Sequence, residues 1–211
     1  MRLYAIDIET DTRDGDGLDP MNPSTRITSV AVCTGNYESS ELEGVIVFDD
    51  PCEERLLRTL NGWLNDPRSE PGVLVTWNGA NFDLPFLMIR AQMCAVGINL
   101  TGKASIARPS KYPPHPSTGP GRVVMWGPHD HADIMYAYQD PALNAGSWRL
   151  KSTARAHGLD PIEVDASRME DLTVAQRVAY NLSDVEITFL LACKVPRLME
   201  YADSRVLTSL S

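Results

Sequence analysis

The chain has 211 residues, of which 43% are hydrophobic and 22% are charged, and its formal net charge is −9. This composition is ordinary for a folded protein, and the length fits one substantial domain. The acidic excess argues against tight binding of duplex nucleic acid, where Lys and Arg normally contact the phosphates. No apolar run approaches the roughly 20 residues of a membrane span. Because a strand is predicted almost at the N-terminus, we expect no signal peptide and a cytoplasmic protein.

The first hundred residues alternate predicted strands and helices. Short runs rich in Val and Ile predict strands, whereas apolar residues spaced three and four apart predict an amphipathic helix. The predicted strands cover residues 2–8, 27–33, 45–48 and 73–77, and the predicted helices cover residues 53–64 and 83–96. Three strands, a helix, a strand and a helix in this order indicate an α/β protein with a mixed sheet and helices on its faces.

A Pro-rich segment, residues 102–120, interrupts the second half of the chain. It predicts an extended surface loop inserted into a single domain of residues 1–211. A strand over residues 122–126 and three short helical stretches should follow, and Thr173 with Gln176 fits a capping box at the start of the last helix. We interpret Asp133 as a helix cap.

Four carboxylates stand out from these predicted elements. Asp7 and Glu9 point to the same side of a strand, because successive side chains alternate faces. Asp184 shares a helical face with Tyr180 inside an apolar stripe, where an unpaired charge is costly. Asp83 opens a helix, so it suits either an N-cap or a metal ligand reached through water. Oxygen-only ligands of this kind favour Mg²⁺ or Mn²⁺ over zinc, and they predict a metal-dependent enzyme.

Each of these residues also has a structural interpretation. Asp7 and Glu9 could simply lead from a strand end into a polar loop, and Asp184 could lie at a solvated helix edge. His129 and His131 could bind a metal ion as a pair, but a loop position is the safer interpretation because no ligand spacing with the cysteines supports the pair.

Three fragments, YAIDIET, WNGANFD and YNLSD, resemble in order the three motifs of the DnaQ-like (DEDD) 3′–5′ exonucleases. The third has the tyrosine form (DEDDy), because Ala179 stands where the histidine form carries histidine. The run NGANFDLPFLMIRA is also similar to the proofreading exonuclease domain of family B DNA polymerases. The residues that carry the resemblance are Asp7, Glu9, Asn78, Phe82, Asp83, Tyr180 and Asp184.

The resemblance implies a ribonuclease H-like fold and a two-metal-ion mechanism. Asp7, Glu9 and Asp184 would hold the first ion, and Asp7 with water-linked Asp83 would hold the second. Tyr180 would orient the attacking water, because a phenol with an ordinary pKa of about 10 is a poor base at neutral pH. The product would be a nucleoside 5′-monophosphate, released from single-stranded DNA or frayed 3′ ends during replication, proofreading or repair.

Candidate substrate contacts lie beside the acidic residues and in the basic part of the chain. Between residues 84 and 129 there are five basic residues, Arg90 among them, and no acidic one, which suits transient handling of a strand end. Asn78 could hold a loop or touch the substrate backbone, and Phe82 could equally be core. The candidate substrate-binding residues are Thr10, Asn78, Phe82, Lys103, Arg108, Lys111 and Lys151.

Two other functions stay open from the sequence. The first is an exoribonuclease of the same fold, which would differ in the space around the terminal 2′-hydroxyl. The second is a non-catalytic nucleic-acid-binding protein that is accessory to a DNA polymerase. All four acidic positions and the tyrosine are present, and a binding module gains nothing from clustered like charges, so catalysis is favoured.

Overall fold

The computed structural model describes residues 1–11, 19–101, 125–140, 142–143, 146, 148–164 and 172–202. Its centre is a five-stranded mixed sheet in the order β3-β2-β1-β4-β7. β1 pairs antiparallel with β2 and parallel with β4, and β7 extends the parallel side. The strands are β1 (Arg2–Thr10), β2 (Ile27–Asn36), β3 (Glu41–Asp49), β4 (Val73–Thr76) and β7 (Asp130–Asp133).

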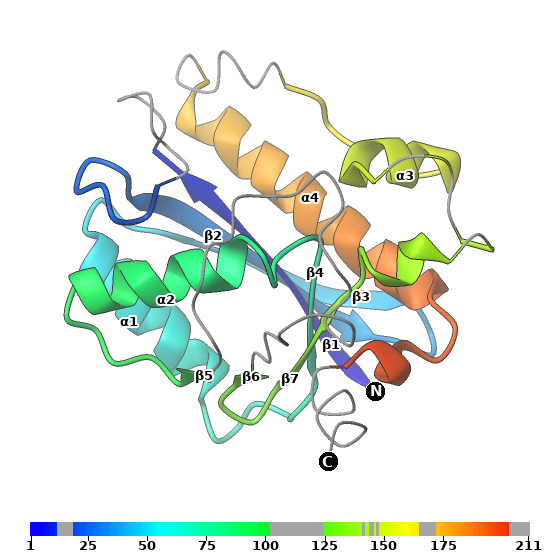
Figure 1. Ribbon diagram of the computed structural model, residues 1–211, viewed down its shortest axis with the longest axis horizontal. Helices are drawn as coiled ribbons and strands as arrows, with labels where there is room; N and C mark the ends of the chain where they lie inside the picture. The colour runs from blue at the N-terminus through cyan, green and yellow to red at the C-terminus, as the bar shows by residue number, and fades with distance from the viewer. Residues whose placement is uncertain are drawn as a thin grey trace.

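Helices cover both faces of this sheet (Figure 1). On one face, α1 (Glu53–Leu64) and α2 (Asp83–Met93) bury Tyr4, Ile6 and Ile8 of β1. On the other face, the long helix α4 (Val174–Lys194) and the short α3 (Leu150–Ala156) form a second core with Leu3 and Ala5. Because side chains alternate along a strand, Asp7 and Glu9 continue the Leu3–Ala5 series and lie on the α4 face.

Short elements complete the chain. The sequence prediction of a mixed α/β sheet flanked by helices is confirmed, and so is the capping box of Thr173 and Gln176 at the start of α4. The predicted loop 102–120 lies outside the described residues, as does the predicted strand 122–126 apart from its last two residues. The short elements are β5 (Leu100–Thr101), β6 (Met125–Trp126), η1 (Ala137–Gln139) and η3 (Leu198–Tyr201).

Two predicted details at α2 are wrong. The helix ends at Met93 rather than near residue 96, because Ala95 takes a left-handed conformation with φ of 53° that stops it. Asp83 is the first helical residue and not the N-cap; that position belongs to Phe82, whose side chain makes no capping bond. The carboxylate of Asp83 is therefore left for contacts outside its own helix.

Arg90 belongs to a buried ion pair and not to a basic surface. Its guanidinium donates to Glu53 at 2.5 and 2.9 Å and also to the main-chain oxygens of Pro20 and Asn22. Glu53 in turn accepts the N–H of Ile27. Since these bonds connect α2 to α1 and to the segment before β2, the charge of Arg90 stabilises the fold and cannot contact a phosphate.

Among the described residues, no helix is long and apolar enough to cross a bilayer.

Candidate active site

The four carboxylates predicted from the sequence come together where β1, α2 and α4 meet. Asp7 and Glu9 lie on the last half of β1, and Asp184 lies on α4 against the same face. Asp83 reaches the strand itself, because its Oδ1 accepts the N–H of Ile8 at 3.3 Å. The start of α2 accordingly lies beside the second half of β1 (Figure 1).

Burial raises the pKa of every member of this group, and repulsion from other members adds to it for Asp7 and Glu9. Burial is the largest cause for each carboxylate, and it raises the pKa of Glu9 to about 8, that of Asp83 to about 7 and that of Asp184 to about 6. The pKa of Asp7 is raised well above its ordinary value by burial and then by Asp83, Glu9 and Asp184. Groups that resist ionising together in this way need positive charge among them.

Lys151 of α3 brings one positive charge into the site. Its Nζ lies 3.2 Å from Asp184 Oδ1 and 3.5 Å from the centre of the Tyr180 ring, and it donates to the main-chain oxygen of Ile162 at 2.5 Å. Lys151 is a predicted substrate contact, but its ammonium group lies among the acidic residues and not on the open surface. One ammonium group cannot balance four ionised carboxylates, so the site still favours the binding of further positive charge.

Tyr180 lies one helical turn before Asp184 and is half-buried. Burial, followed by the charges of Asp184, Glu9 and Asp7, raises the pKa of its hydroxyl group. The phenol therefore stays protonated at neutral pH and can hold a water molecule by hydrogen bonding, but it cannot act as a base.

The donor chemistry of the site fits a divalent cation. Asp184 Oδ1 is buried, and the ammonium group of Lys151 faces it at 3.2 Å. A hard cation such as Mg²⁺ or Mn²⁺ prefers such carboxylate oxygens. In the described part of the chain, no three His, Cys, Asp or Glu side chains already have the arrangement of a metal site.

The predicted substrate contacts have different surroundings. The side chain of Asn78 is used within its own loop, where its Oδ1 accepts from Asn81 at 3.0 Å. Phe82 is partly buried, with its ring 5.4 Å from that of Phe86. Thr10 ends β1, one residue after Glu9. The other predicted contacts, Lys103, Arg108 and Lys111, lie outside the described residues.

The predictions for Asp133 and His131 are wrong. Asp133 is the last residue of β7 and no helix cap, and its buried carboxylate accepts three main-chain N–H groups. His129 and His131 are both fully buried; His131 lies in β7, whereas His129 lies in the connection between β6 and β7, as predicted. Their Nε2 atoms bond to different partners, the oxygen of Leu64 and Oγ1 of Thr76, so they do not act as a metal-binding pair. Bonds from one strand to a distant loop leave no local sequence pattern.

The chain is similar to known polymerase exonuclease domains. The family model for the exonuclease domain of DNA polymerase family B matches residues 1–112, more than half of the chain. The catalytic polypeptide of DNA polymerase epsilon from Schizosaccharomyces pombe is 30% identical over 180 residues, which cover 80% of this chain and 8% of that protein. The family B DNA polymerase of the archaeon Pyrobaculum calidifontis superposes with a TM-score of 0.66 at 21% identity, over 92% of this chain and 24% of that one.

The mixed sheet with helices on both faces is a ribonuclease H-like fold. The chain belongs to the exonuclease domain family of family B DNA polymerases, and it is a 3′–5′ exonuclease. Exonuclease domains of this family depend on divalent metal ions. The chain spans less than a tenth of the curated relative and about a quarter of the solved polymerase.

Proposed function

We propose that this exonuclease removes nucleotides from single-stranded or frayed 3′ ends of DNA by a two-metal-ion mechanism. The observation that carries the proposal is the convergence of Asp7, Glu9, Asp83 and Asp184 from three separate elements into one buried site. Such a cluster is unfavourable in a protein without a cation to bind.

The residues have distinct roles in this mechanism. Asp7, Glu9 and Asp184 would hold the first ion, and Asp7 with Asp83, through water, would hold the second. Bound Mg²⁺ or Mn²⁺ would supply activation of the attacking water and stabilisation of the charge on the attacking and leaving oxygens. The protonated hydroxyl of Tyr180 orients that water.

Lys151 has a supporting role. Its ammonium group lies 3.2 Å from Asp184 and over the ring of Tyr180, so it restrains both side chains. The same positive charge attracts the phosphate of the terminal nucleotide. We therefore keep Lys151 as a substrate-binding residue and add the restraint of Asp184 and Tyr180 to its role.

DNA is the proposed substrate because the named relatives are DNA polymerases. Proofreading or repair of a 3′ end follows from that substrate, with a DNA polymerase as the proposed partner. The product would be a nucleoside 5′-monophosphate. An exoribonuclease remains the second candidate, since nothing in the geometry of Thr10, Asn78 or Phe82 depends on the 2′-hydroxyl group.

One assay tests the proposal. The purified chain is incubated with Mg²⁺ or Mn²⁺ and with single-stranded DNA or RNA of the same sequence, each labelled at its 5′ end. We expect a ladder of products shortened from the 3′ end, faster on DNA, and absent in excess chelator. The control is an Asp7→Ala protein purified in parallel. Preferential degradation of RNA would favour the exoribonuclease, and degradation unaffected by chelator would refute the two-metal mechanism.

A further inference from the structure

Asp133 holds the loop between β4 and α2, residues 77–82, which leads into Asp83. It is 3% exposed, and both of its carboxylate oxygens are used. Oδ1 accepts the N–H of Asn78 at 2.8 Å and that of Met135 at 3.2 Å, and Oδ2 accepts the N–H of Ala80 at 3.0 Å. A carboxylate that accepts several main-chain N–H groups fixes the backbone that carries them.

The same loop is seated on the side chain of Thr76. A methyl group added at Gly79 would lie 2.4 Å from Thr76 Cβ, so the loop passes over Thr76 with no space between them. Thr76 is itself fixed by His131, whose Nε2 lies 2.9 Å from its Oγ1. Thr76 and His131 are both fully buried, and their bond gives the loop a second support beside the bonds to Asp133.

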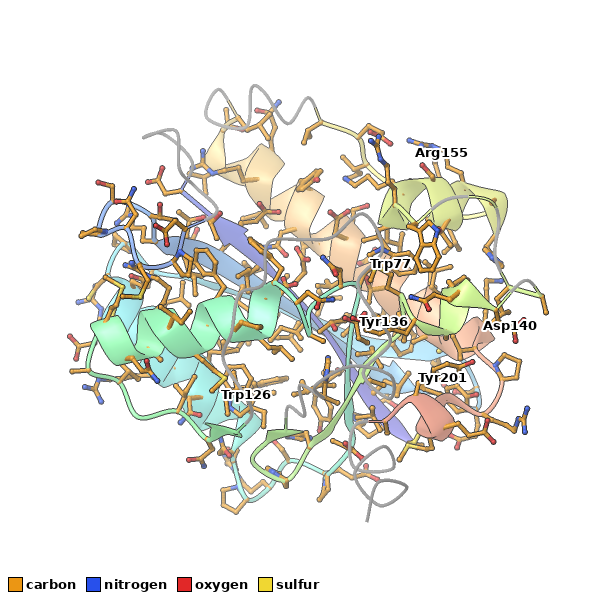
Figure 2. The ribbon with its side chains drawn as sticks, viewed as in Figure 1. Trp77, Trp126, Tyr136, Asp140, Arg155 and Tyr201 are labelled. Atoms are coloured by element: carbon orange, nitrogen blue, oxygen red, sulfur yellow. The ribbon has the colours of Figure 1, made fainter. Side chains whose placement is uncertain are left out.

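Main-chain hydrogen bonds connect this loop directly to the start of α2. Asn78 adopts a left-handed conformation with φ of 67°, and its oxygen accepts the N–H of Phe82 at 3.1 Å. The oxygen of Gly79 accepts the N–H of Leu84 at 3.0 Å. Asp83 lies between these two bonded residues, so its backbone cannot shift without breaking one of them. Figure 2 shows Trp77 and Tyr136, which flank the loop and the turn after β7, near the centre of the molecule.

We propose that Asp133 is a positioning residue, which sets the carboxylate of Asp83 at the place where the second cation is held, with Thr76 and His131 as its support. The inference rests on the proposed two-metal function. Asp133 itself is occupied by three N–H groups, so it contributes no free oxygen to an ion. Its action on Asp83 is through the loop that its three bonds hold.

The substitution Asp133→Asn tests this role. The amide replaces one acceptor oxygen by an NH₂ group, which faces an N–H donor of the loop or of Met135. The matched control is Asp130→Asn, since Asp130 lies on the same strand and its Oδ1 accepts the N–H of His131 within that strand at 2.9 Å. A second variant, Thr76→Val, removes the hydroxyl that His131 binds. Valine is well suited to a strand, so this variant still tests the role of the loop if Asp133→Asn does not fold.

Two measurements on the intact chain give the readout, and neither depends on activity. Calorimetric titration with Mn²⁺ should show two ions in the wild type. In Asp133→Asn, one of them should bind about 10- to 100-fold more weakly, the usual cost of losing a group that orients a metal ligand. Thr76→Val should weaken the same ion by a smaller factor, and Asp130→Asn should match the wild type. In the metal-free protein, hydrogen exchange at the amides of Asn78 and Ala80 should be faster in Asp133→Asn only.

The outcomes separate this inference from the proposed function. If the wild type binds two ions and both folded variants bind them with unchanged affinity, the positioning role is refuted while the two-metal function stands. If the wild type binds no Mn²⁺, the two-metal function is refuted and the inference with it. Equal weakening of both ions would show a general loss of structure and would also refute the specific role of Asp133.

Discussion

Asp184 and Asp83 are two buried carboxylates of one site, and they are held in opposite ways. On the α4 side, Asp184 lies on a long, capped helix and its charge faces Lys151, which also lies over the ring of Tyr180. On the loop side, Asp83 begins α2, and main-chain hydrogen bonds hold the residues around it. One side therefore depends on charge, and the other depends on the shape of a loop. Each should respond to a different kind of perturbation.

Asp7 lies between the two sides, so its loss should have the largest effect. Its pKa is raised by both Asp83 and Asp184, which places it near both carboxylates. We expect Asp7→Ala to abolish hydrolysis of single-stranded DNA, because both proposed ions lose a ligand. The melting temperature of the metal-free protein should rise, because like-charge repulsion is removed. A wild-type initial rate in this variant, purified free of host nucleases, would disprove the two-metal mechanism.

Tyr180→Phe tests the α4 side alone. The substitution keeps the ring that packs under Lys151 but removes the hydroxyl that orients water. We expect kcat to fall by roughly 10- to 1,000-fold, the range of a positioned hydrogen bond or proton transfer. Asp184→Asn should be more damaging, because it weakens metal binding itself.

The measurement for Tyr180→Phe is kcat at saturating metal and substrate. The Mn²⁺ affinity of Tyr180→Phe should stay at the wild-type value, which separates the loss of an oriented water from the loss of an ion. An unchanged kcat would mean that Tyr180 is a packing residue only.

The residues on the α4 side could be predicted from the sequence because they follow the regular spacing of a strand and a helix. Alternation along β1 places Asp7 and Glu9 on one face, and helical spacing places Tyr180 beside Asp184. The contacts that hold the loop before Asp83 could not be predicted from the sequence. Asp133 accepts the main-chain N–H of Asn78, which is 55 residues away in the sequence. Because almost any residue can supply a main-chain N–H group, no pattern of side chains predicts this contact.

Charge alone was also a poor guide to the role of a basic residue. Arg90 was counted with a basic stretch, but Glu53, 37 residues away, neutralises it inside the protein. Lys151 was assigned to the substrate, and it lies against Asp184. The sequence shows how many charges a segment has, whereas long-range pairing decides which of them remain available.

The pH dependence of the metal-free protein follows from the raised pKa values. A carboxylate with a raised folded-state pKa stabilises the fold fully below its unfolded pKa near 4, and that contribution is lost as the pH rises through the folded value. With values of about 6 for Asp184, 7 for Asp83 and 8 for Glu9, the free energy of unfolding should decline between pH 4 and pH 8.

Divalent cations should reverse this trend, since metal binding needs deprotonated ligands. Thermal melts in chelator and in excess Mn²⁺ across this range give the measurement. The stabilisation by Mn²⁺ should grow as the pH rises, and Asp7→Ala should flatten the decline in chelator. A metal-free protein whose stability increases from pH 5 to pH 8 would contradict the charge clustering that both sides of the site share.

Lys151 provides the smallest and most local test of the α4 side. Its side chain and that of Asp184 are 16% and 10% exposed, so the pair is mostly shielded from water. Lys151→Gln should lower the free energy of unfolding of the metal-free protein by about 1–3 kcal/mol, below the 3–5 kcal/mol of a fully buried pair. Arg155→Gln on the same helix is the control, because its pair with Glu163 is exposed at 49% and 55% and should contribute under 1 kcal/mol. Urea unfolding in chelator measures both variants, and an equal effect for the two would show that the charge of Lys151 does not hold Asp184.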